Sequence, residues 1–271
     1  MATVRVNGVT LFYEEVGAGS ETVVFSHGFL MDRTMFRAQI EALRGEYRCL
    51  AYDHRGHGRS EKTAVGYEME NLYADAVAFI ETMACAPCHF VGMSTGGFVG
   101  LQLAIRRPDL LKSLTLIDTS ADAEPKEGLG QYKLMANVVR FLGWWPVINR
   151  VMAILFADPN PKDPVRRTAV SEWKTRIQRN DRMATFRFGY GIWARESVYD
   201  QLGQIRTPTQ IIVGEKDIPT PVSRSERMAA AIPGAQLAII PDAGHTSPVE
   251  QPEQVTAVLR QFLASVTQTT T

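Results

Sequence analysis

The sequence carries no net charge, because its 29 lysines and arginines are matched by 29 aspartates and glutamates. It also lacks a basic stripe with interleaved aromatic residues, which is typical of surfaces that bind nucleic acid. An even balance of this kind gives no reason to expect a polyanionic partner. The composition therefore argues against a nucleic-acid partner.

Cysteines and long apolar runs are scarce as well. The three cysteines are an odd number, which predicts no disulfide framework and fits a reducing, cytoplasmic setting. Cys85 and Cys88 form a C-x-x-C at the end of a predicted helix rather than at its start, so we predict a structural role. The first residues contain no basic segment followed by an apolar run, so no secretory signal is expected. The longest apolar stretch, residues 141–156, is too short and too polar to cross a bilayer.

Short β-rich runs alternate with helical patterns along most of the chain. Strands are predicted at residues 4–9, 11–16, 22–26, 47–52, 88–91, 111–117, 209–213 and 236–240. Helices are predicted at residues 33–43, 67–84, 95–107, 222–232 and 252–262. This spacing predicts an α/β fold with a mostly parallel eight-stranded sheet that is flanked by helices on both faces.

The alternation is interrupted between residues 121 and 203. This stretch is helix-forming and contains all four tryptophans of the chain. It lies between two predicted strands, which favours a helical cap (lid) inserted before the last two strands over a second, unrelated domain. We therefore expect a core domain of residues 1–120 and 204–271 and a cap of residues 121–203.

Residues 92–96, Gly-Met-Ser-Thr-Gly, match the pattern G-x-S-x-G between a predicted strand and a predicted helix. Such a sharp turn exposes its serine and brings the residues two before and two after it close together. Small side chains are needed there, and Gly92 and Gly96 provide them. The context favours Ser94 as a nucleophile over an incidental serine in an ordinary turn.

A serine hydroxyl becomes a good nucleophile only when a neighbouring base takes its proton. His245 is the only one of the five histidines that follows Ser94, and it comes just after the last predicted strand. The order serine, acid, histidine is typical of this kind of fold. These observations predict that His245 is the base.

The acid that orients the histidine is expected between these two residues. Asp217 comes shortly after the seventh predicted strand and is our first choice. Asp118, at the end of the sixth predicted strand, is the competing candidate, and Glu215 is a weaker one.

Attack on an acyl carbon creates an oxyanion, which needs hydrogen-bond donors already in place. The backbone N–H of Thr95, directly after the nucleophile, is one expected donor. The second is expected from the loop after the third predicted strand, and we choose the Phe29 N–H. Gly28 allows the chain to approach closely there, and His27 is expected to hold the loop rather than to react.

Three motifs resemble those of the α/β-hydrolase fold family of serine hydrolases. They are Ser-His-Gly-Phe at residues 26–29, Tyr-Asp-His-Arg-Gly-His-Gly-Arg-Ser at residues 52–60, and Val-Gly-Met-Ser-Thr-Gly-Gly at residues 91–97. Gly244 and His245, followed by Glu250, Pro252 and Phe262, are similar to the end of the family pattern. The match is closest to small carboxylesterases, 3-oxoadipate enol-lactonase-like proteins and esterases that open N-acyl-homoserine lactones. The resemblance implies hydrolysis of a carboxylic ester or lactone. Branches that act as dehalogenases or epoxide hydrolases have aspartate where this chain has Ser94.

The substrate is expected to be a small neutral ester or lactone. Several apolar residues near the expected site or within the cap are candidates for a substrate pocket: Met31, Met93, Phe141, Trp144, Trp145, Met152, Leu155 and Phe156. Most of them could equally pack the cap onto the core. The proposed chemistry requires no metal ion or organic cofactor, and a monomer or homodimer is expected.

Two other functions remain open at this point. The same three residues support carbon–carbon bond hydrolysis of a diketone in related proteins. A ligand receptor built on this fold, with vestigial turnover, is the alternative from another class.

Overall fold

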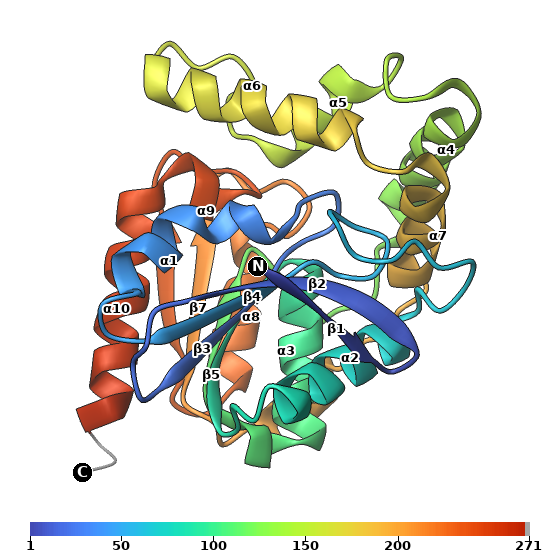
Figure 1. The fold of residues 1–271 in the computed structure, drawn as a ribbon. Coiled ribbons are helices and arrows are strands. Elements are labelled where there is room, and N and C mark those ends of the chain that lie inside the picture. The colour runs from blue at the N-terminus through green and yellow to red at the C-terminus, as the bar shows by residue number, and fades with distance from the viewer. Residues whose placement is uncertain (269–271) are drawn as a thin grey trace.

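The computed structural model describes residues 1–268, and an eight-stranded sheet forms the centre of this part of the chain (Figure 1). Its order is β1-β2-β4-β3-β5-β6-β7-β8. The strands are β1 Ala2–Val6, β2 Val9–Val16, β3 Thr22–Ser26, β4 Arg48–Tyr52, β5 Cys88–Met93, β6 Leu111–Ile117, β7 Thr209–Gly214 and β8 Gln236–Ile240. β2 is antiparallel to β1 and β4, and all pairs from β4 to β8 are parallel. The predicted fold class is confirmed.

The first hairpin shows how local sequence determines the edge of the sheet. Asn7 and Gly8 both have positive φ, at 44° and 75°, as a two-residue turn that matches the strand twist requires. The turn therefore lies at Asn7–Gly8, and β1 and β2 each begin two residues earlier than predicted from the sequence.

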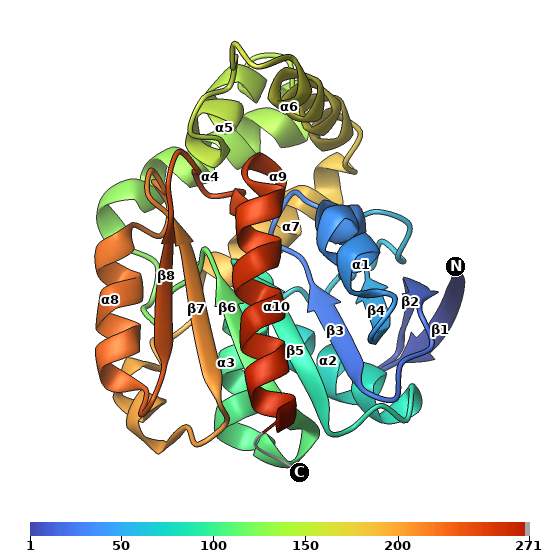
Figure 2. The same cartoon turned by 90° about the vertical axis from the view of Figure 1, so that its left-hand side faces the viewer.

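Helices cover both faces of the sheet (Figure 2). α1 Arg37–Leu43 and α10 Pro252–Gln268 pack on one face, and α2 Met69–Thr82, α3 Thr95–Arg106 and α8 Val222–Ala231 pack on the other. β3 explains why two layers are needed. Its side chains alternate between the faces, so that Val23 and Phe25 join the α1–α10 side while Val24 joins the other. All five of its residues are buried, as in a strand covered on both sides.

Four short helices connect these elements. They are η1 Arg33–Phe36, η2 Pro108–Leu110, η3 Tyr199–Gln204 and α9 Ser247–Glu250. The helix predicted at residues 33–43 is therefore two pieces, a 3₁₀ turn followed by α1. Among the residues described, no helix is long and apolar enough to cross a membrane.

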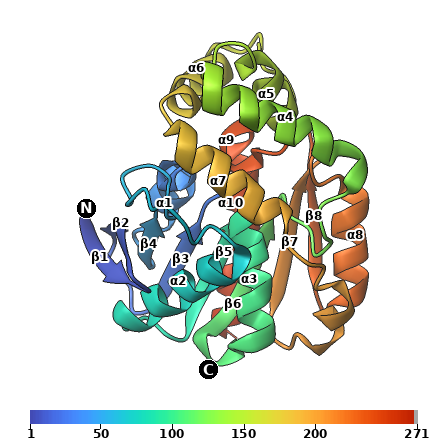
Figure 3. The same cartoon turned by 90° about the vertical axis from the view of Figure 1, so that its right-hand side faces the viewer.

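Four α-helices, followed by the short helix η3, lie between β6 and β7, as the sequence predicted for an insertion before the last two strands. They are α4 Lys126–Leu142, α5 Ile148–Leu155, α6 Pro164–Gln178 and α7 Arg182–Trp193, and we call residues 126–193 the helical insert. Aspartate caps start α6 and α7, because Asp163 and Asp181 each accept a hydrogen bond from a first-turn N–H at 2.8 Å. The insert lies beyond the edge of the sheet to which the arrowheads of β7 and β8 point (Figures 2 and 3).

The site lies where the sheet changes its winding direction. β3 has β4 on one side and β5 on the other, so the chain passes from β4 across β3 to reach β5. In open α/β sheets, the loops that follow such neighbouring strands diverge and leave a crevice for a ligand. The loops after β3 and β5 therefore meet beneath the helical insert.

Candidate active site

The turn from β5 into α3 holds Ser94 in a strained conformation, with φ 50° and ψ −110°. The Ser94 N–H donates to the carbonyl of Ile117 at 2.9 Å, and its own carbonyl accepts from Thr119 Oγ1 at 2.8 Å. A Cβ on Gly92 would overlap the backbone of Gly96, and a Cβ on Gly96 would overlap the carbonyl of Ser26, the last residue of β3. The structure therefore explains why the positions two residues before and two residues after the serine lack a side chain.

Three side chains from separate loops form one chain of hydrogen bonds. His245 Nε2 lies 3.0 Å from Ser94 Oγ, and His245 Nδ1 lies 3.0 Å from both carboxylate oxygens of Asp217. An ionised carboxylate only accepts, so we assign the ring proton to Nδ1, which leaves Nε2 to accept from the serine hydroxyl. All three residues are at most 8% exposed. This arrangement prepares the serine oxygen to lose its proton to the ring.

Charges around the imidazole stabilise its protonated form. Burial opposes a charge on His245, but the attraction and hydrogen bond of Asp217, together with the charges of Asp118 and Glu250, raise its pKa above the usual value. Asp217 is itself held by Thr220, whose N–H and hydroxyl donate to its two oxygens at 2.9 and 2.8 Å. The ring can therefore accept a proton and remain charged without leaving its place.

Asp118, the competing acid, points to other partners. Its carboxylate accepts from the N–H of Gly214 at 2.8 Å and from the N–H and hydroxyl of Ser247 at 3.0 and 2.7 Å. Burial and repulsion from Asp217 raise its pKa to about 7. Asp118 thus ties the end of β7 to the segment just after His245 and makes no hydrogen bond to the ring itself within the described residues. Glu215, the weaker candidate, accepts from the N–H of Asp242 at 3.2 Å at the surface.

Two backbone N–H groups near Ser94 have no acceptor among residues 1–268. One belongs to Thr95, the first residue of α3, where a helix leaves its N–H groups unpaired. The other belongs to Phe29, in the loop after β3. This loop passes close to the nucleophile, because a Cβ on Gly28 would lie 3.1 Å from Ser94 Cβ.

The model of the alpha/beta hydrolase fold family matches residues 21–252. This chain belongs to that family. A putative carbamate hydrolase, RutD, from Stutzerimonas stutzeri is 29% identical over 252 residues, which cover 90% of this chain and 91% of the relative. The structure of a thermophilic esterase from Thermogutta terrifontis matches with a TM-score of 0.91 at 29% identity, covering 98% of this chain and 99% of that one. The enol-lactonase from Burkholderia xenovorans LB400 matches with a TM-score of 0.89 at 27% identity, covering 97% and 100%. The predicted resemblance is confirmed.

In this α/β-hydrolase an apolar cavity opens between Ser94 and the helical insert. It holds about 890 Å³ of atom-free space, counted out to its open mouth, and both Ser94 and His245 line it. One side of α4 forms much of its wall, with residues at helical spacing: Tyr132, Met135, Ala136 and Val139. This i, i+3, i+4, i+7 stripe was visible in the sequence and was the signal that could have identified the wall.

Of the eight residues predicted for a substrate pocket, two line the cavity and six do not. Trp144 and Leu155 line the cavity. Phe141 and Trp145 do not line it, because they are 68% and 84% exposed at the surface. Phe141 is on the face of α4 that turns away from the stripe. Gly143, with φ 83°, ends the helix so that Trp144 turns inward and Trp145 outward.

The four remaining candidates, Met31, Met93, Met152 and Phe156, are no more than 2% exposed and pack in the core instead. Each belongs to the hydrophobic cluster that joins the helical insert to the α1–α10 side of the sheet. They do not line the cavity described here. These four residues therefore contribute to the packing between the helical insert and the core.

The cavity wall has one charged pair. Arg195 Nη1 lies 2.8 Å from Glu124 Oε2, and the guanidinium stacks 4.0 Å over the ring of Phe98. Both charged residues line the cavity. Burial lowers the pKa of Arg195, but an arginine stays charged in any case. This pair therefore offers a polar contact within a mostly apolar cavity.

Glu250 is a supporting residue for which no role was predicted from the sequence. Its carboxylate accepts from the N–H of Gly244 and the hydroxyl of Thr246, at 3.0 and 2.9 Å, on either side of His245. It also accepts from the N–H of Ala157, in the helical insert, at 2.8 Å. Apart from the family resemblance, nothing in the sequence distinguishes it from a surface glutamate. Within the described chain, no three His, Cys, Asp or Glu side chains are placed to hold a metal ion.

Proposed function

We propose that this protein hydrolyses carboxylic esters or lactones through an acyl-enzyme formed on Ser94. The observation that carries the proposal is the hydrogen-bonded chain from Ser94 Oγ through His245 to Asp217, with 3.0 Å at each step, at the wall of an apolar cavity. The esterase and the enol-lactonase among the similar structures support the same class of substrate.

In the first half-reaction, Ser94 Oγ attacks the acyl carbon while its proton passes to His245 Nε2. The carbonyl oxygen becomes an oxyanion, and Asp217 stabilises the imidazolium that has formed. The tetrahedral intermediate then collapses, the bond to the leaving oxygen breaks, and His245 gives its proton to that alkoxide. The products of this half are an alcohol and an acyl-serine; in a lactone, the alcohol stays attached to the acyl group.

In the second half-reaction, water takes the place of the alcohol. His245 Nε2 accepts a proton from the water as its oxygen attacks the acyl-serine carbon. Collapse of the second intermediate returns the proton to Ser94 Oγ and releases the carboxylic acid. The residues are thus restored with no net gain or loss of protons.

We further propose that the N–H groups of Phe29 and Thr95 form the oxyanion hole. Both are unpaired within the described residues, and they come from loops that meet at Ser94. The Thr95 N–H also lies at the positive end of the dipole of α3. Donors fixed in place before the reaction stabilise the developing charge without the cost of reorganising solvent.

The substrate class follows from the cavity. Its wall is mostly apolar, so we propose that it takes the acyl part of a neutral ester or lactone, with the Arg195–Glu124 pair meeting a polar group at one end. We propose that residues 121–203 form the cap that selects this substrate, above a core of residues 1–120 and 204–271. Both charges of the pair are matched, which gives no preference for an anionic substrate.

A hydrolysis panel tests the proposal. We expect multiple turnover on p-nitrophenyl esters or N-acyl-homoserine lactones, and Ser94→Ala should lower kcat by roughly 10⁶-fold because the acyl-enzyme cannot form. Product analysis on a diketone substrate tests carbon–carbon bond hydrolysis in the same panel. Tight binding without multiple turnover on any ester would contradict the proposal and favour a receptor, and turnover retained in Ser94→Ala would remove Ser94 as the nucleophile.

A further inference from the structure

The loop between β3 and η1, residues 27–32, contains a costly turn next to the nucleophile. The Met31 N–H donates to the carbonyl of Gly28 at 3.2 Å, and Leu30 lies between them with φ 68°. A positive φ at this point of a turn normally requires glycine or asparagine, because a Cβ is crowded there. Leu30 therefore keeps this conformation only if its surroundings hold it.

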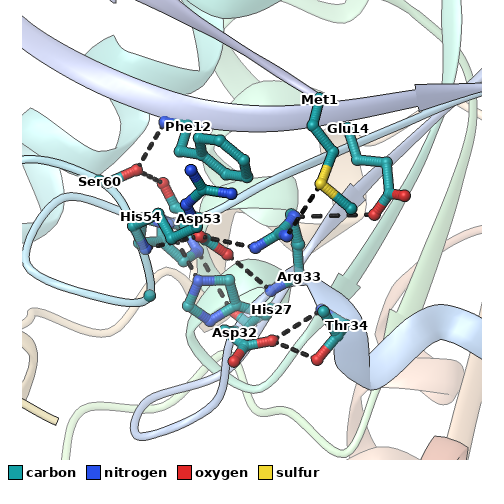
Figure 4. Close-up of polar contacts among 12 residues, drawn as sticks. Met1, Phe12, Glu14, His27, Asp32, Arg33, Thr34, Asp53, His54 and Ser60 are labelled. Atoms are coloured by element: carbon teal, nitrogen blue, oxygen red, sulfur yellow. Dashed lines mark hydrogen bonds and ion pairs between the residues drawn. The ribbon is translucent and has the colours of Figure 1, made fainter.

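The core holds the loop from below. The Leu30 N–H donates to His57 Nε2 at 3.2 Å. His27 Nε2 accepts from the N–H of His54 at 2.9 Å, so its Nδ1 carries the proton and donates to the carbonyl of Gly28 at 2.8 Å. Figure 4 shows His27 directly beside His54 and Asp53 at the ends of β3 and β4. These contacts hold the Leu30 N–H and the Gly28 carbonyl but do not include the Leu30 carbonyl.

The helical insert holds the loop from above. Asn180, between α6 and α7, donates through Nδ2 to the Leu30 carbonyl at 2.8 Å. The ring of Phe188 in α7 stacks on Phe29 with centroids 5.5 Å apart and planes 5° from parallel. Arg176 in α6 reaches Asp32 at 3.3 Å, at the far end of the same loop. Both peptide groups of Leu30 are thus bonded, one to the core and one to the insert.

We propose that Asn180 is a positioning residue that holds the Phe29 N–H in line for the oxyanion. The proposal rests on the proposed function, since it assumes that Phe29 donates to an oxyanion formed on Ser94. The hydrogen bond from Asn180 fixes the carbonyl of the residue that follows Phe29, and the stacked Phe188 fixes the Phe29 ring. The helical insert then serves the chemical step as well as substrate binding.

The location of Asn180 separates these two roles. Among the described residues, those that line the cavity do not include Asn180. Its loss should therefore leave substrate binding nearly intact and weaken the contact that matters when the oxyanion forms. An interaction made only in the transition state lowers kcat and kcat/KM together and leaves KM unchanged.

The test compares Asn180→Ala and Asn180→Asp with the wild type and with Asn137→Ala. Asn137 is also an asparagine of the helical insert, with its amide bonded to the carbonyl of Lys133 and the hydroxyl of Tyr190, away from the loop. Asn180→Asp keeps the shape but removes the donor. We expect both Asn180 variants to lose roughly tenfold in kcat, less than the 10²–10³ for removing a donor outright. KM should stay within about twofold, and Asn137→Ala should change neither parameter.

A second measurement uses butylboronic acid, whose boron accepts Ser94 Oγ and places an oxygen where the oxyanion forms. Its inhibition constant should rise by the same factor as kcat falls in the Asn180 variants. An unchanged kcat, a raised KM with unchanged kcat, or an equal loss in Asn137→Ala would each overturn the role of Asn180. If the wild type hydrolyses no ester, or Ser94→Ala keeps its activity, it is the proposed function that fails.

Discussion

The strand-end loops and the helical insert place their side chains by different means. Directional hydrogen bonds hold the side chains of Ser94, Asp217 and His245, and the backbone of Ser94 has a restricted, positive φ. In the insert, the cavity wall is made of apolar side chains on one face of α4, which contact a ligand without a required direction. The first region tolerates almost no change in geometry, whereas the apolar wall on α4 can change shape while the chemistry stays the same.

The largest effects are expected from changing the two buried aspartates near His245, Asp217 and Asp118. Asp217→Asn leaves the geometry in place but lets the ring adopt the wrong tautomer, so we expect kcat to fall by about 10⁴-fold. Asp118→Asn disturbs only the support from β7 and Ser247, and we expect a loss of roughly tenfold or less, within the range of a weakened supporting network. Steady-state kinetics on one ester check both. A larger loss for Asp118→Asn would make Asp118 the orienting acid.

The pH profile sharpens the same comparison. The base must be neutral, so kcat/KM should rise with pH through the pKa of His245 and then level off. The negative charge of Asp217 raises that pKa despite burial, so the midpoint should lie above about 6.5. In Asp217→Asn, the largest attraction is gone, so the residual activity should have its midpoint at a lower pH.

One control is needed for this profile, because Asp118 has its pKa raised to about 7 by burial and by repulsion from Asp217. If His245 is the titrating group, the rise of kcat/KM with pH persists in Asp118→Asn, and its midpoint shifts slightly to lower pH. Loss of this pH dependence in Asp118→Asn would assign the titration to Asp118. His27 and His54 have their pKa well below the usual value through burial, so they stay neutral across the range measured.

The two regions also differ in how far the sequence predicts them. The alternation of strands and helices along the chain and the places of Ser94, Asp217 and His245 at strand ends follow from short-range patterns, because a sharp turn or a strand end restricts the types of the neighbouring residues. The cavity wall depends on which face of a helix turns inward. Two adjacent tryptophans such as Trp144 and Trp145 do not indicate which of them is buried. The contacts that Glu250 and Asn180 make with Ala157 and Leu30 were missed for a different reason, because these partners are 93 and 150 residues away in the sequence.

The smallest expected effect lies in the helical insert. Met135 is half-buried and lines the cavity, so Met135→Ala enlarges the space for an acyl chain. We expect the ratio of kcat/KM for a longer to a shorter p-nitrophenyl ester to rise by roughly three- to tenfold, the lower end of what one or two methylenes contribute. Trp145→Ala is the matched control, because that side chain is 84% exposed and should leave the ratio unchanged. A shift with Trp145→Ala and none with Met135→Ala would mean that the ligand lies against the outer face of the insert.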